Sequence, residues 1–224
     1  MKRAMTDSAK AEKAKLILDA AYEIYKMNPF EKIKMTDIAK AAKVSNGTLF
    51  YYYSTKETLF MEIVFREYEQ RFKKFEDLLL PIEMMTYSEF KVLFLKEMES
   101  ILDQDSVFIR LIAIKSTILE KNVDYDTTIK GSLGLFHLLD DIVRLLSERL
   151  ELITAESYYE LLQAQNAIII GYANAASFPA AMLQVLAEHK LDGFKMDFKR
   201  DALKAMEYYL DGVYERERLK RTAE

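Results

Sequence analysis

The sequence predicts an all-α protein with a small N-terminal helical domain and a larger helical C-terminal domain. Apolar residues recur at the spacing of helices, and no segment alternates as strands do. Only six Gly and three Pro occur among 224 residues, so helices have few places to break. We place the domain boundary between residues 55 and 56, giving domains of residues 1–55 and 56–224.

The first expected helix covers residues 9–27 and ends at Asn28-Pro29. Residues 38–57 then have the apolar spacing and capping residues of two short helices joined by a tight turn. Small Ala39 allows a close helix crossing, and Ser45 is placed to cap the second helix. We expect Leu49 and Phe50 to belong to the core.

A long helix is expected over residues 55–80, because this segment has no Gly or Pro and is followed by Pro81. Ser54 and Glu57 have the spacing of a capping box at its start. A helix of some 25 residues spans roughly 38 Å, so it can belong to both domains.

Further helices are expected along the rest of the chain. A second capping box, Thr86 with Glu89, opens the first of them, and Thr154 or Ser157 begins a later one. The expected ranges, with a loop at 121–125, are 86–103, 106–120, 133–150, 154–178 and 197–220.

Residues 161–187 contain no charged side chain. A membrane span is rejected because several amide side chains lie within the segment and Pro179 interrupts it. Two alternatives stay open for this segment: an internal core helix or a dimer interface. Its many Ala residues would let another helix approach closely.

Composition and charge narrow the class of protein. Hydrophobic residues make up 50% and charged residues 30%, which is typical of a globular chain, and the absence of Cys excludes disulfides and thiolate metal sites. No signal-peptide pattern is present, so we expect a cytoplasmic protein. Residues 1–60 hold 11 Lys plus Arg against 7 Asp plus Glu, whereas the rest holds 21 against 29, so the N-terminal part suits phosphates.

Residues 15–63 resemble the N-terminal DNA-binding domain of the TetR family of transcriptional regulators. The resemblance depends on residues 17–21 in the first helix, 37–39 opening the second, 44–49 in the turn and recognition helix, and 54–59 starting the long helix. It implies a sequence-specific regulator, commonly a repressor, that binds a near-palindromic double-stranded DNA operator. It also implies a homodimer through the last two long helices, residues 154–178 and 197–220.

The resemblance further implies release from the operator by a small lipophilic effector in the C-terminal domain. By helix face we select as lining residues Phe94, Met98, His137, Asn166, Ile170 and Tyr172. The acidic C-terminal part favours cationic or neutral ligands. For His137 a hydrogen-bonded core or boundary position is the alternative role. A C-terminal domain that docks a protein partner is the alternative function.

The recognition helix supplies most of the expected DNA contacts. Asn46 can pair with adenine, the Thr48 methyl group can pack on thymine, and Gly47 permits close approach. Tyr51 and Tyr52 can contact bases, sugars or phosphates, and Lys56 lies where the long helix begins and can bind phosphate. The full set of expected DNA-contacting residues is Thr36, Lys43, Ser45, Asn46, Gly47, Thr48, Tyr51, Tyr52 and Lys56.

Several positions depart from the family pattern. Lys43 replaces the usual turn Gly, at a cost of about 1 kcal/mol if its backbone is left-handed. Phe50 replaces a Tyr and cannot make that residue's phosphate hydrogen bond, and Tyr53 replaces a Phe. Lys34 occupies the usual capping position, so we expect the second helix to begin slightly later, at Thr36.

An enzyme is not expected. His137 and His189 lack metal-ligand spacing, no phosphate-binding Gly loop is present, and Asp140 and Asp141 point to different sides of a helix. We therefore expect no catalytic residues, no bound metal and no cofactor.

Overall fold

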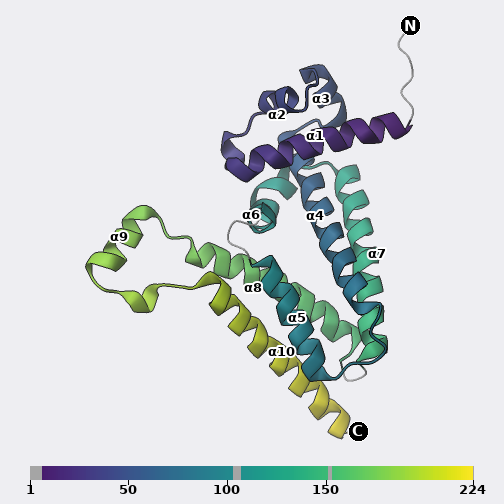
Figure 1. Ribbon diagram of the computed structural model, residues 1–224, viewed down its shortest axis with the longest axis vertical. Coiled ribbons are helices and arrows are strands. Elements are labelled where there is room, and N and C mark those ends of the chain that lie inside the picture. The colour runs from purple at the N-terminus through teal and green to yellow at the C-terminus, as the bar shows by residue number, and fades with distance from the viewer. Residues whose placement is uncertain (1–6, 103–106, 151–152, 224) are drawn as a thin grey trace. The chain divides into compact units, whose positions relative to one another are not determined.

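The computed structural model describes residues 7–102, 107–150 and 153–223, and each regular element in these ranges is helical (Figure 1). This confirms the all-α prediction. The α-helices are α1 (Asp7–Met27), α2 (Met35–Ala41), α3 (Asn46–Tyr52), α4 (Lys56–Leu79), α5 (Tyr87–Ile101), α6 (Val107–Ile114), α7 (Tyr125–Arg149), α8 (Ala155–Ala176), α9 (Ala180–Glu188) and α10 (Phe198–Ala223). Short turns of 3-10 or π helix connect some of them.

The chain forms two compact units. The first unit comprises Met1–Glu69 with Ile114–Leu135, and the second comprises Gln70–Ala113 with Phe136–Glu224. The helices α4 and α7 each pass from one unit into the other. The boundary that we placed after residue 55 therefore falls inside the first unit.

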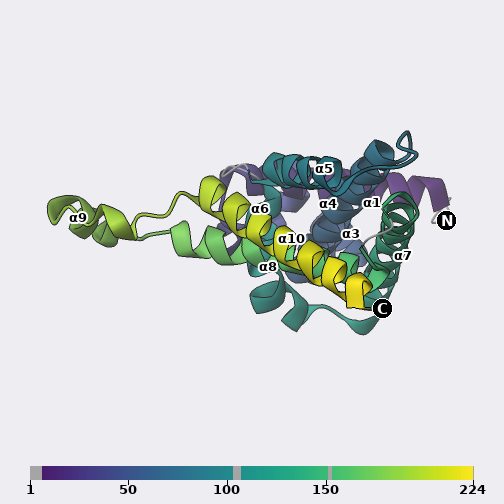
Figure 2. The same ribbon diagram turned by 90° about the horizontal axis from the view of Figure 1, so that it is seen from below.

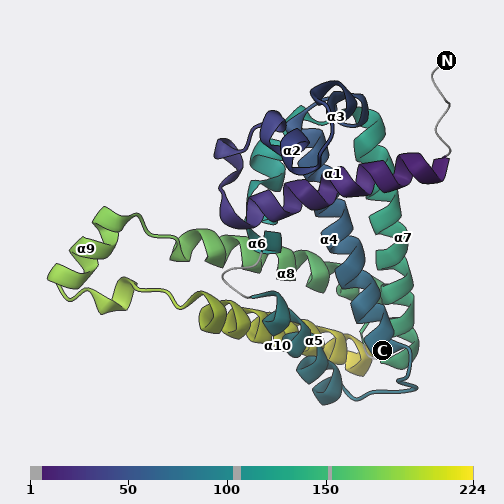
Figure 3. The ribbon, with the colours of Figure 1, turned by 45° about the horizontal axis from the view of Figure 1, so that its top comes forward.

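The core of the first unit joins α1, α2, α3 and the start of α4 (Figure 3). Its aromatic centre is Phe60, whose ring lies edge-on to Tyr25 at 5.2 Å and to Phe30 at 5.1 Å between centroids. Fully buried aliphatic side chains of this unit include Ile17, Ile38, Leu49, Leu59 and Ile63. Burial of this many large apolar groups fixes how the short helices cross.

The predicted end of the first helix is confirmed, because α1 stops at Met27, directly before Asn28-Pro29. The predicted capping box at the start of the long helix is wrong by one residue. Thr55, rather than Ser54, accepts the N–H of Thr58 with its hydroxyl, at 3.0 Å. The start of α4 is therefore capped one position further along the chain.

In the second unit α8 and α10 lie side by side, and α5 packs against α10 (Figures 1 and 2). The predicted capping box is confirmed: the Thr86 hydroxyl accepts the Glu89 N–H at 3.3 Å, and the Glu89 carboxylate accepts the Thr86 N–H at 2.8 Å. Thr154 caps α8 by accepting the N–H of Ser157 at 3.3 Å. Of the two predicted starts for this helix, Thr154 is therefore the observed one.

The middle of the chain differs most from prediction. The helix expected over residues 106–120 is instead α6 followed by a π-helical turn, Lys115–Leu119, and its expected start at Ser106 lies outside the described residues, as does the expected end of the preceding helix at Asp103. The helix α7 begins at Tyr125, eight residues before the predicted Leu133. Its early start has a local cause, because the Asp124 carboxylate accepts the Thr127 N–H at 2.8 Å.

Among the described residues, no single helix combines the length and the apolar composition of a membrane span. The pair α8 and α9 reaches that composition only when taken together, and it bends by 69° at the break between the two helices.

Candidate nucleic-acid interface

The helices α2 and α3 form a helix-turn-helix with a tight, hydrogen-bonded turn. The Val44 N–H donates to the carbonyl oxygen of Ala39 at 3.0 Å across the turn. Lys43 has φ of 53°, so the backbone is left-handed at the position where Gly is usual, which is the case that costs about 1 kcal/mol. The exposed side chain of Lys43 thus extends from the corner of the motif.

Ser45 caps α3 as predicted. Its hydroxyl accepts the N–H of Thr48 at 3.0 Å, and the two hydroxyl oxygens lie 2.8 Å apart. This pairing restrains the side chain of Thr48 on the first turn of α3. The helix that would read DNA is therefore ordered by its own local contacts before any ligand binds.

The first turn of α3 presents small uncharged groups to solvent. Asn46 and Gly47 are exposed and Thr48 is partly exposed. A Cβ added to Gly47 would meet only the Ser45 hydroxyl, at 3.9 Å, so packing within the chain does not require glycine here. A reason for glycine at this position is instead that it lets a surface outside the chain come close to the α3 backbone.

The aromatic residues that follow are divided between surface and interior. Phe50 is 50% exposed and Tyr51 is 73% exposed, so the prediction that Phe50 belongs to the core is wrong. Leu49 fills the core position, and consecutive helical residues point about 100° apart. The hydroxyl of Tyr52 is buried and finds no hydrogen-bond partner among the described residues, which leaves Tyr51 as the exposed phenol.

Tyr53, which stands where the family usually has Phe, is buried and donates its hydroxyl hydrogen to Glu62 at 3.1 Å. Burial, followed by the neighbouring Glu62 carboxylate, raises the pKa of Tyr53 above its usual range. The extra hydroxyl is thus accommodated by a partner on α4.

The second helix begins earlier than predicted. α2 starts at Met35, because the Asp37 carboxylate accepts the N–H of Lys34 at 3.3 Å. Asp37 therefore binds the backbone N–H of the N-cap residue Lys34, which is the bond that the third helical residue makes in a capping box. Thr36 is exposed on the first turn of α2, which keeps it accessible as a phosphate candidate.

Lys56 lies on the first turn of α4 and points to the turn that precedes α2. Its ammonium donates to the carbonyl oxygens of Phe30 and Ile33, at 2.8 and 3.0 Å. It also lies 4.0 Å from the centroid of the Phe30 ring. Sequence reasoning missed these partners, which are 26 and 23 residues away along the chain.

The expected effector-lining residues differ in exposure. Phe94 and Met98 are buried in α5, where Phe94 packs 5.6 Å from Phe90 between ring centroids. His137 is exposed on α7, and the three candidates on α8 are partly exposed: Asn166, Ile170 and Tyr172.

A cavity of about 360 Å³ within the second unit is lined by none of these six residues. Its lining residues are Ile109, Arg110, Ala113, Ala173, Asn174, Ala176, Ser177 and Phe198. This lining has one basic side chain, Arg110, and no acidic one. It therefore does not favour the cationic ligands that the acidic composition of the C-terminal part suggested. The run of small residues at the end of α8 was the sequence signal for it.

The acidic pair on α7 has ordinary partners. Tyr159 donates to Asp140 at 2.8 Å, and Arg144 pairs with Asp141 at 3.2 Å. Among the residues that the structure describes, no group of three or more His, Asp or Glu side chains could hold a metal ion.

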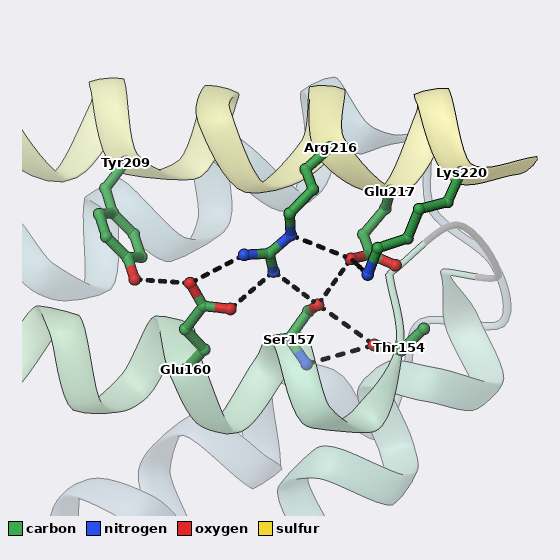
Figure 4. A network of polar contacts seen from close by, with 7 residues as sticks. All are labelled: Thr154, Ser157, Glu160, Tyr209, Arg216, Glu217 and Lys220. Atoms are coloured by element: carbon green, nitrogen blue, oxygen red, sulfur yellow. Dashed lines mark hydrogen bonds and ion pairs between the residues drawn. The ribbon is translucent and has the colours of Figure 1, made fainter.

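A polar network joins α8 to α10 (Figure 4). Glu217 is buried and accepts hydrogen bonds from Ser157 at 3.1 Å and from Lys220 at 2.9 Å. Glu160 accepts from Arg216 at 2.6 Å and from Tyr209 at 2.7 Å. Lys220 lowers the pKa of Glu217, and Arg216 lowers that of Glu160, so both carboxylates are ionised at neutral pH.

The uncharged segment 161–187 is mostly accessible in the single chain. Within it only Leu161, Ile169 and Leu186 are buried. On α8 the small residues Ala167, Gly171 and Ala175, four positions apart, are exposed. The alternative of an internal core helix therefore does not fit this segment.

Comparisons with protein families match both parts of the chain. Residues 17–63 match the family described as bacterial regulatory proteins, tetR family. Residues 94–217 match the family described as tetracyclin repressor-like, C-terminal domain. The second match alone spans more than half of the chain.

Curated relatives include the HTH-type transcriptional regulators UidR of Escherichia coli K12 and of Shigella flexneri, each 33% identical over 76 residues. The match covers 34% of this chain and 37% of each relative, so the chain aligns with little more than a third of their length.

Two solved structures share the fold at 16% sequence identity. A TetR-family transcriptional regulator from Mesorhizobium loti MAFF303099 has a TM-score of 0.56, covering 93% of this chain and 97% of its own. The TetR-family repressor AlkX from Dietzia sp. strain DQ12-45-1b, implicated in biodegradation of n-alkanes, has a TM-score of 0.51, covering 90% and 96%.

Proposed function

The chain belongs to the TetR family of helix-turn-helix transcriptional regulators, a non-enzymatic family, and from this premise we propose that it is a repressor released from a palindromic operator by a small lipophilic molecule. The observation that carries the proposal is the exposed, uncharged face of α3, held in place by the Ser45 cap and the buried Leu49. Such a face can enter a major groove without desolvating a charge.

The exposure of each side chain on α3 indicates which DNA contact it makes. Asn46 and Thr48 read base edges, and Gly47 lets the backbone come close. Phe50 is exposed and has no hydroxyl, so its ring offers an apolar contact, for which the thymine methyl group is the matching partner in the groove. Tyr51 takes the hydroxyl contact, since the Tyr52 hydroxyl is turned inward.

Phosphate contacts come from the edges of the motif. Lys43 extends from the turn and Thr36 from the first turn of α2, both exposed. Contacts of this kind set the register of a protein on DNA without reading its sequence. Ser45 serves chiefly through its cap.

The dimer forms through α8 and α10. The uncharged segment, the exposed row of small residues on α8 and the network that stiffens the α8–α10 pair support this assignment. Two recognition helices held at a fixed distance bind two half-sites together, whose centres lie one helical turn or a multiple of it apart.

The effector acts by differential binding. A hundredfold loss of operator affinity requires that it favour the DNA-incompetent arrangement by about 2.7 kcal/mol. The cavity near the end of α8 supports a small molecule as the regulator. Exposed apolar side chains on the segment around α9, including Leu183 at 51% and Phe194 at 67%, favour the second candidate, a protein partner.

Selection of sequences from a random DNA pool with the purified protein, at two salt concentrations, tests the proposal. We expect a two-fold symmetric consensus that persists at the higher salt concentration. Enrichment of no sequence would contradict the proposal, because only the sequence-independent phosphate attraction would then remain.

A further inference from the structure

The ammonium of Lys56 is held by three groups of one short segment. Two are the carbonyl oxygens of Phe30 and Ile33, and the third is the face of the Phe30 ring. The segment is the 3-10 turn Phe30–Lys32 with the residue after it, which leads directly into α2. Lys56 thus connects the first turn of α4 to the chain that positions α2.

We call these contacts of Lys56 with Phe30 and Ile33 the Lys56 clamp, and the groups that hold the ammonium are themselves fixed. The Phe30 ring is buried and packs against Phe60, and Ile33 is buried as well. The carbonyl oxygen of Phe30 also accepts the N–H of Ile33, at 3.2 Å. An ammonium placed between these groups neutralises their converging dipoles and restrains the turn.

We propose that Lys56 is a positioning residue for DNA binding, which orients α2 through the Phe30–Ile33 turn and does not bind phosphate itself. The inference rests on the proposed operator binding. It replaces the phosphate contact that its sequence position suggested. Lys56 lies at the start of α4, and α4 continues into the second unit. The clamp thus joins this long helix to the turn before α2.

The two roles predict different salt dependences. A lysine that binds a DNA phosphate displaces a counterion from the DNA. Its loss therefore makes the negative slope of log affinity against log salt concentration shallower by about 0.9. A positioning lysine is already paired within the protein, so its loss weakens binding at each salt concentration and leaves the slope unchanged. Lys43, which is exposed, is the matched control.

The experiment measures operator binding by the full chain over a series of salt concentrations for the wild type, Lys56→Met and Lys43→Met. For Lys56→Met we expect about a tenfold loss of affinity, or ~1.4 kcal/mol, with the wild-type slope. For Lys43→Met we expect the slope to fall by about one unit. A reduced slope in Lys56→Met, or unchanged affinity with only a lower melting temperature, would overturn the proposal.

A measurement on the wild type covers the case in which Lys56→Met does not fold. Acetylation of lysines, read by mass spectrometry, should find Lys56 slow to react both free and on DNA, because its ammonium is engaged in both states. Lys43 should react when free and be protected by DNA. A Lys56 that reacts readily when free and is protected by DNA would contradict the clamp.

The two proposals fail separately. If the wild type selects no sequence, operator binding fails, yet slow acetylation of Lys56 in the free protein still supports the clamp. If the wild type selects an operator and Lys56→Met changes the slope, only the positioning role fails.

Discussion

The recognition helix of the first unit and the helix pair of the second differ in how far apart along the chain their interacting polar residues lie. In the first unit the contacts that build the recognition helix are three residues apart, as in the Ser45–Thr48 cap. In the second unit the polar contacts between helices join distant residues, with Ser157 and Glu217 60 apart and Tyr87 and Asp211 124 apart. Only the first kind can be recognised from spacing in a sequence.

The units differ also in what they expose. The first presents a few small or aromatic groups on one short helix, which suits base edges. The second exposes a long uncharged stretch on α8 and buries one charged side chain, Glu217, between α8 and α10. Recognition of DNA thus falls to single side chains, whereas association of subunits would fall to a whole helix face. Substitutions in the two units should therefore differ in size and kind.

The largest effect is expected from a charge on the exposed face of α8. Ala175→Glu places a carboxylate in the proposed interface, where it would be desolvated without a partner. We expect a monomer in light scattering and a loss of operator affinity of about 100-fold or more, since the second half-site no longer binds intramolecularly.

Val92→Glu is the matched control for that substitution. Val92 is exposed on α5, which is not one of the two helices of the proposed interface, so this variant should stay dimeric and bind as the wild type does. If Ala175→Glu remains a dimer with full affinity, α8 does not form the interface.

A smaller and more selective effect is expected on α3. Asn46→Ala should cost about 1–3 kcal/mol at the base pair that Asn46 reads, and much less on operators already changed there. Binding titrations on a panel of single-base operator variants measure this. A uniform loss over the whole panel would mean that Asn46 positions the helix rather than reads a base.

A substitution in the polar network between α8 and α10 should change the stability of the second unit rather than DNA recognition. Glu217→Gln removes a buried charge, and we expect the free energy of unfolding to fall by about 1–2 kcal/mol at neutral pH. Because the pKa of Glu217 is lowered on folding, this contribution is complete above its usual pKa of 4.5 and is lost as pH falls through the folded value. Denaturant unfolding between pH 3 and pH 7 should show the full difference between the two proteins above pH 4.5 and a shrinking difference as the pH falls below it.

Glu215→Gln provides the comparison for that measurement. Glu215 pairs with Arg218 at 2.9 Å, but both side chains are about half exposed, so its removal should cost less than about 0.5 kcal/mol. Equal losses in the two variants would mean that burial of Glu217 adds nothing.

The smallest effect concerns Phe50. Replacing the contacted thymine by deoxyuridine removes one methyl group and should cost about 0.8 kcal/mol in the wild type. In Phe50→Ala the same replacement should have no effect, because the apolar partner is absent. Equal sensitivity of the wild type and the variant in binding titrations would remove Phe50 from the reading residues.

Prediction from sequence succeeded where one local interaction decides the structure. Ser45 and Thr86 were expected as caps and are caps, and Thr154, one of two expected starts of α8, is its cap. Prediction failed where two adjacent residues could each occupy the same structural position. Thr55 took the cap assigned to Ser54, and Leu49 took the core position that Phe50 was expected to share.

The candidate site was less predictable than the fold for the same reason. Exposure of Asn46 and Gly47 follows from helix periodicity, but the inward turn of the Tyr52 hydroxyl does not. The partners of Lys56 lie on a turn more than 20 residues earlier, and no spacing rule links them. The cavity lining likewise combines side chains from α6, α8 and α10.

The sequence by itself determined the all-α architecture, the helix-turn-helix with the Ser45 cap, the family, and the absence of charge in residues 161–187. These follow from periodicity, local capping and composition, which act within a few residues. Only the tertiary structure decided that Lys56 holds the turn before α2, that Phe50 faces solvent and that Glu217 is buried with its partners. Each of these depends on which distant groups packing brings within a few ångströms, and that is a property of the folded chain.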